Sequence, residues 1–479
     1  MPTIDTPYRL APLRRETRRR PLALRADVFA SVTVALMAAV GSANAQSLSH
    51  DGSQLDSLVA SAQSASPAVR AAASRVDAAR TRVGPAAAWS DPMLMAGIQN
   101  LPLGKEAPSS PMGGMSGGVG PDPMTMRMVG VSQTIPYPGK LSLRRRAAER
   151  EVEAAQSGLD AVRWQVTRDV KHTYYELAFL DQALAIVERT SAALANFVRL
   201  TDARYAVGSA AQQDVLKARV EAARLAETAA SLKEDRRTAL AQLNALLVRP
   251  SDTPLEGAAV PARVARAAIA DSAQAIRFTS AALGARAADS PLPPLAELQD
   301  EALRNSPELR EQEAMIAAQT LRLALARKDV LPDIDVSLEY GQRPARPDMI
   351  TATVSVPLPV FKRQKQDASV AENNAQLAAL EADRSKKEND IRAEVAQLVS
   401  DLERSRAQLA LYVKAVIPQS RAALASATAS YQVAKVEFLT VLDDQATLFN
   451  YETEYWRALT NFADKLAELE RVTGKEVLR

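Results

Sequence analysis

A run of 67 residues from Leu141 to Val207 contains no proline and repeats apolar side chains at spacings of three and four. Folded as one helix, this run would be about 100 Å long at the usual rise per residue. Its apolar seam consists of Leu177, Leu180, Leu184, Val187, Leu194 and Val198, with Ser191 in the one polar slot. Such a seam is typical of helices that pack lengthwise against other helices. The chain is therefore predicted to be built on very long helices.

A second stretch repeats this pattern near the C-terminus. Residues 141–248 and 364–473 each indicate a long helical hairpin, with turns at Tyr205–Ala211 and Tyr431–Glu437. Pro418 predicts a kink before the second turn, and Leu459, Phe462, Leu466 and Leu469 continue the seam after it. At a constant offset of 226 residues (431 − 205), Tyr205, Val207, Gly208, Asp214, Val215 and Leu216 fall on Tyr431, Val433, Ala434, Thr440, Val441 and Leu442. These matches predict an internal duplication.

Short helices come before each long hairpin. Ser66-Pro67 and Ser306-Pro307 mark two helix starts that lie 240 residues apart (307 − 67), because proline suits the first turn of a helix. We therefore predict a first repeat over 46–250, a connector over 251–291 and a second repeat over 292–479.

Alternating segments lie between the short and the long helices. Asp333–Tyr340 and Ile350–Val356 alternate apolar with acidic or hydroxyl residues, which predicts a β-hairpin over 333–357. The first copy predicts a hairpin over about 92–135, with strands Met93–Gln99 and Met124–Ile135. One apolar and one polar face are expected of a strand between lipid and a wet lumen. Since the smallest transmembrane barrels need about eight strands, these four predict a barrel shared between chains.

The N-terminal segment has the pattern of a signal peptide over residues 1–45. Arginines precede an apolar run from Val28 to Val40, and Ala43-Asn44-Ala45 predicts cleavage after Ala45. Arginine pairs leave a twin-arginine signal as the alternative to general secretion. Without these residues the charge is 59 − 7 = 52 positive against 56 − 3 = 53 negative groups, a net of −1, which disfavours a nucleic-acid partner. Cysteine is absent, which excludes disulfides and thiolate metal sites.

The chain is predicted to have a signal peptide and then, in each repeat, short helices, a β-hairpin and a long helical hairpin. The turns of the long hairpins read Tyr-x-Val-Gly and Tyr-x-Val-Ala. This order of elements and these turns resemble the TolC family of outer-membrane efflux proteins. The resemblance implies an α+β membrane protein that forms a homotrimer. Three protomers would share a 12-stranded outer-membrane β-barrel that continues as a periplasmic α-barrel. Its tip would dock onto a periplasmic adaptor and an inner-membrane RND-type pump. Such a protein is a passive exit duct without a cofactor, not an enzyme, in a Gram-negative bacterium.

Three stretches of the first copy are most similar to family members that export heavy-metal cations. They are Asp91–Met93, Met124–Met128 and Ser132–Leu141. The resemblance therefore implies cargo such as Cu/Ag or Co/Zn/Cd. A duct for drug efflux or type I protein secretion is the alternative within the family, and a periplasmic adaptor or a coiled-coil scaffold is the alternative of another class. The paired strands, which have one apolar face suited to lipid, disfavour both the adaptor and the scaffold.

Methionines gather in the first hairpin, where five are predicted on the lumenal face. They are Met93, Met95, Met124, Met126 and Met128. Thioether sulfur is a soft ligand that suits Cu(I) or Ag(I), so these side chains are candidates for transient metal contacts. The alternative is that methionine is an adaptable apolar filler at the barrel rim.

The second turn carries candidate gate residues. Asp443 lies where the family's turn motif places an aperture aspartate, Thr440 replaces a second one, and Asp444 and Asp214 are neighbouring candidates. Carboxylates repeated by threefold symmetry would form a ring that attracts cations. The alternative is acids on a solvated helix face. The family's arginine latch after the second turn is here Val436.

The two turns themselves resemble the family's adaptor-docking turns. The candidate docking residues are Val207, Gly208 and Ser209 in the first turn, and Val433, Ala434 and Lys435 in the second. Small residues allow a tight reversal and the close approach of another helical hairpin. A plain helix-hairpin turn without a partner is the alternative.

Overall fold

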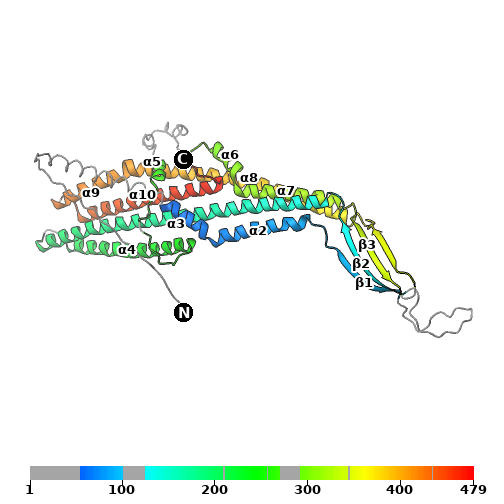
Figure 1. Ribbon diagram of the computed structural model, residues 1–479. Helices are drawn as coiled ribbons and strands as arrows, with labels where there is room; N and C mark the ends of the chain where they lie inside the picture. The colour runs from blue at the N-terminus through cyan, green and yellow to red at the C-terminus, as the bar shows by residue number, and fades with distance from the viewer. Residues whose placement is uncertain are drawn as a thin grey trace, which may run out of the picture. The chain divides into compact units, whose positions relative to one another are not determined.

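The computed structural model describes residues 54–100, 125–208, 211–255, 257–269, 292–343, 346–433 and 435–478 (Figure 1). The contacts divide the chain into Met1–His50 and Asp51–Arg479, and every described residue belongs to the second unit. The predicted signal peptide over 1–45, with cleavage after Ala45, lies outside the described residues.

The order of elements in the first half is repeated in the second. A helix over 54–65 is followed by α2 (Pro67–Ala87), β1 (Met93–Gln99), β2 (Met126–Ile135), α3 (Lys140–Ala206) and α4 (Gln212–Leu246). The second half contains α6 (Leu295–Asn305), α7 (Pro307–Lys328), β3 (Ile334–Gln342), β4 (Met349–Ser355), α8 (Gln366–Leu411), α9 (Ile417–Gln432) and α10 (Phe438–Thr473). Between the two halves lies α5 (Ala262–Ile269). Most of the helices and strands begin and end within two residues of the positions expected from the sequence.

The helix before the second turn is distorted where a kink was predicted. A π-helical turn over Tyr412–Val416 separates α8 from α9, and Pro418 follows directly in the first turn of α9. Proline has no amide hydrogen to donate and its ring crowds the preceding turn. The wider turn ahead of Pro418 is a local response of a kind that π-bulges commonly provide.

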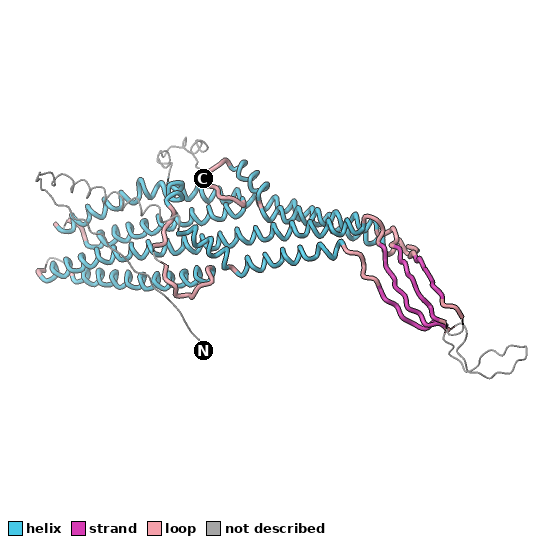
Figure 2. The backbone as a smooth tube through the Cα atoms, in the orientation of Figure 1, coloured by secondary structure: helices cyan, strands magenta, loops and turns pink. Residues whose placement is uncertain are grey.

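The core follows the long helix α3, which packs against α2, α4, α7 and α10 (Figures 1 and 2). Tyr174 and Leu177 of α3 and Phe462 of α10 are fully buried. Burying an apolar side chain of this size contributes about 1.5–3 kcal/mol. The predicted seam of α3 is confirmed at Leu177, Leu180, Val187 and Leu194, whereas Leu184 and Val198 are only half-buried. Burial spreads to Ala183 and Ile186 because α3 faces helices on several sides.

The four strands form one antiparallel sheet in the order β1-β2-β3-β4 (Figure 2). Its central pair, β2 and β3, joins the two repeats, with Val131 opposite Leu338 and Ser132 opposite Ser337. Directly opposite residues in an antiparallel sheet project to the same face. The register therefore places apolar residues of all four strands on one face and polar residues on the other.

Within the described ranges, no helix combines the length and the apolarity that a membrane span requires.

Candidate functional site: sheet face, helical tip and ionic junction

The apolar face of the sheet is widely exposed in the single chain. Leu94, Ile350 and Val354 are 75%, 74% and 67% exposed, and Val129, Val131 and Leu338 of the central strands project to the same side. Monomeric soluble proteins rarely leave a contiguous apolar surface of this kind uncovered. A face of this composition fits contact with an apolar environment.

The opposite face carries hydroxyl, acidic and thioether groups. Asp335, Ser337 and Glu339 of β3 lie on this face together with Thr351, Thr353 and Ser355 of β4. Through the register, Met93 and Met95 of β1 and Met126 and Met128 of β2 fall on the same face. The shared face expected for these four methionines is thus confirmed, and their role as metal ligands stays a hypothesis.

The structure places the starts of two methionine-containing strands differently from the prediction. The prediction began the second strand at Met124, whereas β2 begins at Met126, and Met124 lies outside the described residues. The last strand begins at Met349 and not at Ile350 as predicted. Met349 is opposite Gly341, so it lies on the polar face. The sequence prediction did not place Met349 on this face, because its predicted strand began one residue later.

The first turn of the tip depends on a glycine. Gly208 has a φ of +72°, a left-handed conformation that glycine adopts without a steric penalty, and its N–H donates to the Tyr205 carbonyl at 2.9 Å. Val207 is 77% exposed. In the second turn Val433 is 63% exposed, and the Lys435 N–H donates to the Ser430 carbonyl at 2.9 Å. Ser209 and Ala434, the other two docking candidates, lie outside the described residues.

A compact cluster of side chains holds the two turns together. Tyr431 and Phe438 are buried with ring centroids 5.5 Å apart. The guanidinium of Arg204, from the end of α3, lies 4.6 Å from the centre of the Tyr431 ring and also donates to the Tyr431 carbonyl. The sequence prediction missed Arg204 and noted only that Val436 replaces the family's arginine. In this chain Arg204, directly before the first turn, bonds to Tyr431 at the start of the second.

The gate candidates lie close to these turns. Asp443 and Thr440 are exposed on α10, whereas Asp444 on α10 and Asp214 on α4 are half-buried. Across the described part of the chain, no group of three or more His, Cys, Asp or Glu residues is arranged to hold a metal ion. The described part of the single chain therefore does not gather these residues into a metal cage.

Ion pairs connect α3 with α10 along their contact. Lys171 and Glu470 are both buried, with Nζ and Oε2 2.6 Å apart. On the neighbouring residue of α3, Nδ1 of His172 lies 2.6 Å from Oδ1 of Asp464. The hydrogen bond to Asp464 raises the pKa of His172. Burial acts to raise the pKa of Asp464, but the hydrogen bond and the charge of His172 lower it overall. Both shifts favour the charged pair.

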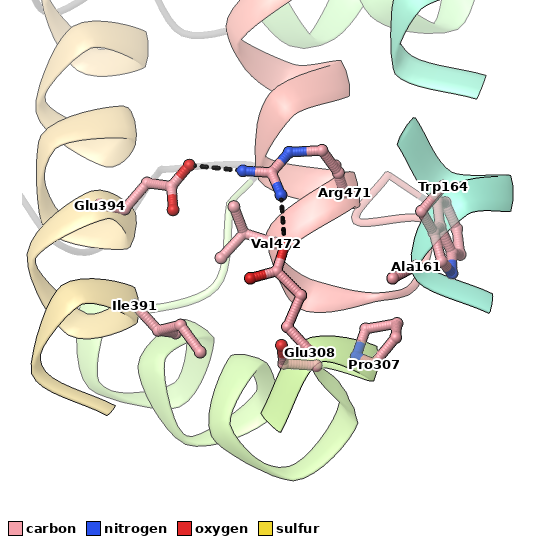
Figure 3. Close-up of a pocket in the computed structure, with 9 residues that line it drawn as sticks. Ala161, Trp164, Pro307, Glu308, Ile391, Glu394, Arg471 and Val472 are labelled. Atoms are coloured by element: carbon pink, nitrogen blue, oxygen red, sulfur yellow. Dashed lines mark hydrogen bonds and ion pairs between the residues drawn. The ribbon is translucent and has the colours of Figure 1, made fainter. Parts of the chain in front are cut away.

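Arg471 is the centre of a junction between three helices (Figure 3). Its guanidinium lies 2.7 Å from Glu394 of α8, 3.1 Å from Glu308 of α7 and 2.7 Å from Glu468 of its own helix. Trp164 of α3 lines the adjoining hollow, whose volume of about 20 Å³ has room for about one water molecule. The junction is therefore suited to holding helices together and not to binding a substrate.

Comparison with known proteins identifies the family. The sequence profile described as outer membrane efflux protein matches residues 58–248 and 298–475. The chain belongs to the outer membrane efflux protein family. The cobalt-zinc-cadmium resistance protein CzcC of Cupriavidus metallidurans is 26% identical over 347 residues, covering 70% of this chain and 74% of CzcC. The resemblance to this family stated from the sequence is confirmed, including the similarity to a heavy-metal resistance member.

Solved structures show the same fold as this member of the efflux family. The outer membrane protein VceC of Vibrio cholerae matches with a TM-score of 0.70 and 18% identity, covering 89% of this chain and 97% of VceC. CusC matches with a TM-score of 0.70 and 17% identity, covering 88% of this chain and 92% of CusC. Membership in an efflux family places the chain among transport proteins and not among enzymes.

Proposed function

We propose that the chain is the outer-membrane exit duct of a tripartite efflux pump that exports heavy-metal cations. The observation that carries the proposal is the sheet with one apolar and one polar face, attached to long helices from both repeats. Its edge strands, β1 and β4, are each paired along one side only, and exposed strand edges are templates for pairing with another chain. Pairing β4 of one copy with β1 of the next in a homotrimer gives 3 × 4 = 12 strands.

The proposed barrel spans the outer membrane, with the apolar face on lipid and the polar face on the lumen. The helices continue it as an α-barrel into the periplasm. A periplasmic adaptor and an inner-membrane RND-type pump complete the assembly. A periplasmic adaptor or a coiled-coil scaffold fits less well, because neither accounts for a sheet with an exposed apolar face.

Heavy-metal cargo is supported by the similarity to CzcC, whose name states resistance to cobalt, zinc and cadmium. Drug efflux or type I protein secretion is the competing cargo class. Deletion of the gene should lower tolerance to heavy-metal salts and leave tolerance to drugs unchanged, and a plasmid copy should restore it. Growth over a concentration series of each compound distinguishes the two classes. A strain that loses only drug tolerance would contradict the metal proposal.

We assign Asp443 to a cation-attracting ring near the tip, with Asp444, Asp214 and Thr440 as its neighbours. Asp443 lies on α10 close to the second turn, and three symmetry-related carboxylates raise the local cation concentration. Asp443→Asn should reduce the cation selectivity of purified protein in planar bilayers, because it removes the charge and keeps the shape. Glu149→Gln, on the far part of α3, is the matched control. Equal selectivity in wild type and Asp443→Asn would exclude Asp443 from the gate.

We assign adaptor docking to the two turns, at Val207, Gly208 and Ser209 and at Val433, Ala434 and Lys435. The first turn leaves open space around its glycine, because a Cβ at Gly208 would meet no atom within 4 Å. Gly208→Trp should therefore abolish crosslinking to the adaptor, because it strains the left-handed backbone of the turn and fills the open space beside it. Gly257→Trp, which also has a positive φ and open space but lies outside both turns, should not. Undiminished crosslinking by Gly208→Trp would favour a plain turn without a partner.

A further inference from the structure

Methionine and glycine alternate across the outer part of the polar face. The register aligns Gly97 of β1, Met128 of β2, Gly341 of β3 and Met349 of β4 in one row. This row lies toward the strand ends that are remote from the helices, since α3 follows the far end of β2 and α8 follows the far end of β4. Each methionine in the row thus has a neighbour without a side chain.

A third thioether lies over the same glycine. A Cβ built on Gly341 would be 2.8 Å from Sδ of Met126, so the sulfur of Met126 covers the space above Gly341. Met128 and Met349 are the cross-strand partners of Gly341 on either side, one strand spacing of about 4.8 Å away. Three flexible thioether side chains, those of Met126, Met128 and Met349, therefore lie around Gly341, which has no side chain of its own.

The surroundings favour a cation. Glu339 lies on the same face one row closer to the helices, opposite Gly130 and Thr351, and Asp335 follows two rows further. These carboxylates add negative charge to the face without being part of the methionine group. Met126 and Met128 are half-buried, and Met349 is 39% exposed, so the group is accessible from the polar side.

We propose that Met126, Met128 and Met349 form a site for soft monovalent cations, Cu(I) or Ag(I), with Met95 as a nearby further ligand. Thioether sulfur selects such ions, whereas Zn²⁺ and Co²⁺ prefer imidazole, thiolate or carboxylate ligands. The neutral sulfurs give weak, exchangeable contacts that suit an ion in transit. This proposal rests on the proposed function as a metal exit duct and adds Cu(I) and Ag(I) to the cobalt, zinc and cadmium that the name of CzcC states.

The test uses the full-length protein purified in detergent, with Ag⁺ in chloride-free buffer as the probe. Bound silver is measured by equilibrium dialysis with elemental analysis of both compartments, and its ligands by X-ray absorption at the silver edge. Wild type should bind saturably with sulfur neighbours. The triple variant Met126→Leu, Met128→Leu, Met349→Leu should lose this binding, because leucine keeps the volume and removes the sulfur. Met315→Leu, on α7 and away from the sheet, should bind as wild type.

Two glycine variants test the geometry with every thioether retained. Gly341→Ala places a methyl group 2.8 Å from Sδ of Met126, so the sulfur must move, and should weaken Ag⁺ binding about tenfold, as displaced supporting groups do at metal sites. Gly97→Ala, in the same row, meets no atom within 4 Å and should leave the affinity unchanged. Wild type without sulfur-coordinated silver, or a triple variant with wild-type binding, would overturn the site.

The silver-binding experiment and the gene-deletion experiment test different proposals, and each can fail without the other. If the deletion strain loses zinc and cobalt tolerance while the purified protein binds no silver, the methionine site fails and the exit-duct proposal stands. If silver binds through sulfur but deletion changes no metal tolerance, the heavy-metal duct fails and the site itself remains.

Discussion

Lys171→Ala is expected to destabilise the helical part of the protein by about 3–5 kcal/mol, the range found when one partner of a buried ion pair is removed. Lys171 and Glu470 each expose 7% of their side chains, so the substitution leaves the Glu470 carboxylate buried without its cation. Urea unfolding of the purified protein, followed by far-ultraviolet circular dichroism, should show the loss as a lower midpoint.

A second variant separates loss of the pair from loss of packing. Lys171→Met combined with Glu470→Leu replaces both charges by apolar side chains of similar length and should recover most of the lost stability. Arg145→Ala is the surface control, because Arg145 and Glu149 form an exposed pair on α3, and such pairs contribute about 0.3–0.5 kcal/mol. If Lys171→Ala shifted the midpoint no more than Arg145→Ala, the pair would not support the α3–α10 contact.

The local features of the fold could be predicted from the sequence because their signals are local. The absence of proline between Leu141 and Val207 predicts a helix that the structure confirms at Lys140–Ala206. Strict alternation after Pro332 predicts both the strand and its two faces. Pro418 predicts a distortion, although the sequence does not indicate that it takes the form of a π-helical turn.

The contacts between distant segments could not be predicted in this way. Lys171 pairs with a residue 299 positions away, and Arg204 bonds to a carbonyl 227 positions away. Charged residues on a helix face look alike in sequence whether they meet solvent or a partner helix. Only the packing of α3 against α10 and α9 selects which of them pair. The same holds for Met349, because the strand register decides which side chains surround Gly341.

The contact between the two turns is another feature that the sequence did not predict. Arg204, near the end of α3, stacks its guanidinium on the Tyr431 ring and donates to the Tyr431 carbonyl. The sequence prediction considered an arginine only after the second turn, where Val436 stands.

Leu338→Arg is expected to prevent assembly in the outer membrane, whereas Ser337→Arg is not. The two residues are neighbours on β3, and the register places Leu338 on the apolar face and Ser337 on the polar face. An arginine on the lipid face near the bilayer midplane costs about 2–4 kcal/mol in a β-barrel, and a homotrimer would carry it in each of its copies.

The measurement is the amount of heat-resistant oligomer in isolated outer membranes, with Leu338→Ala as the control for loss of side-chain volume. Leu338→Arg should lose the oligomer, and Leu338→Ala and Ser337→Arg should keep it. Ser337→Arg should instead lower cation conductance in bilayers, because it adds a ring of positive charge to the lumen. Equal loss of oligomer for both arginine variants would mean that neither face of the sheet contacts lipid selectively, and the shared-barrel proposal would fall with it.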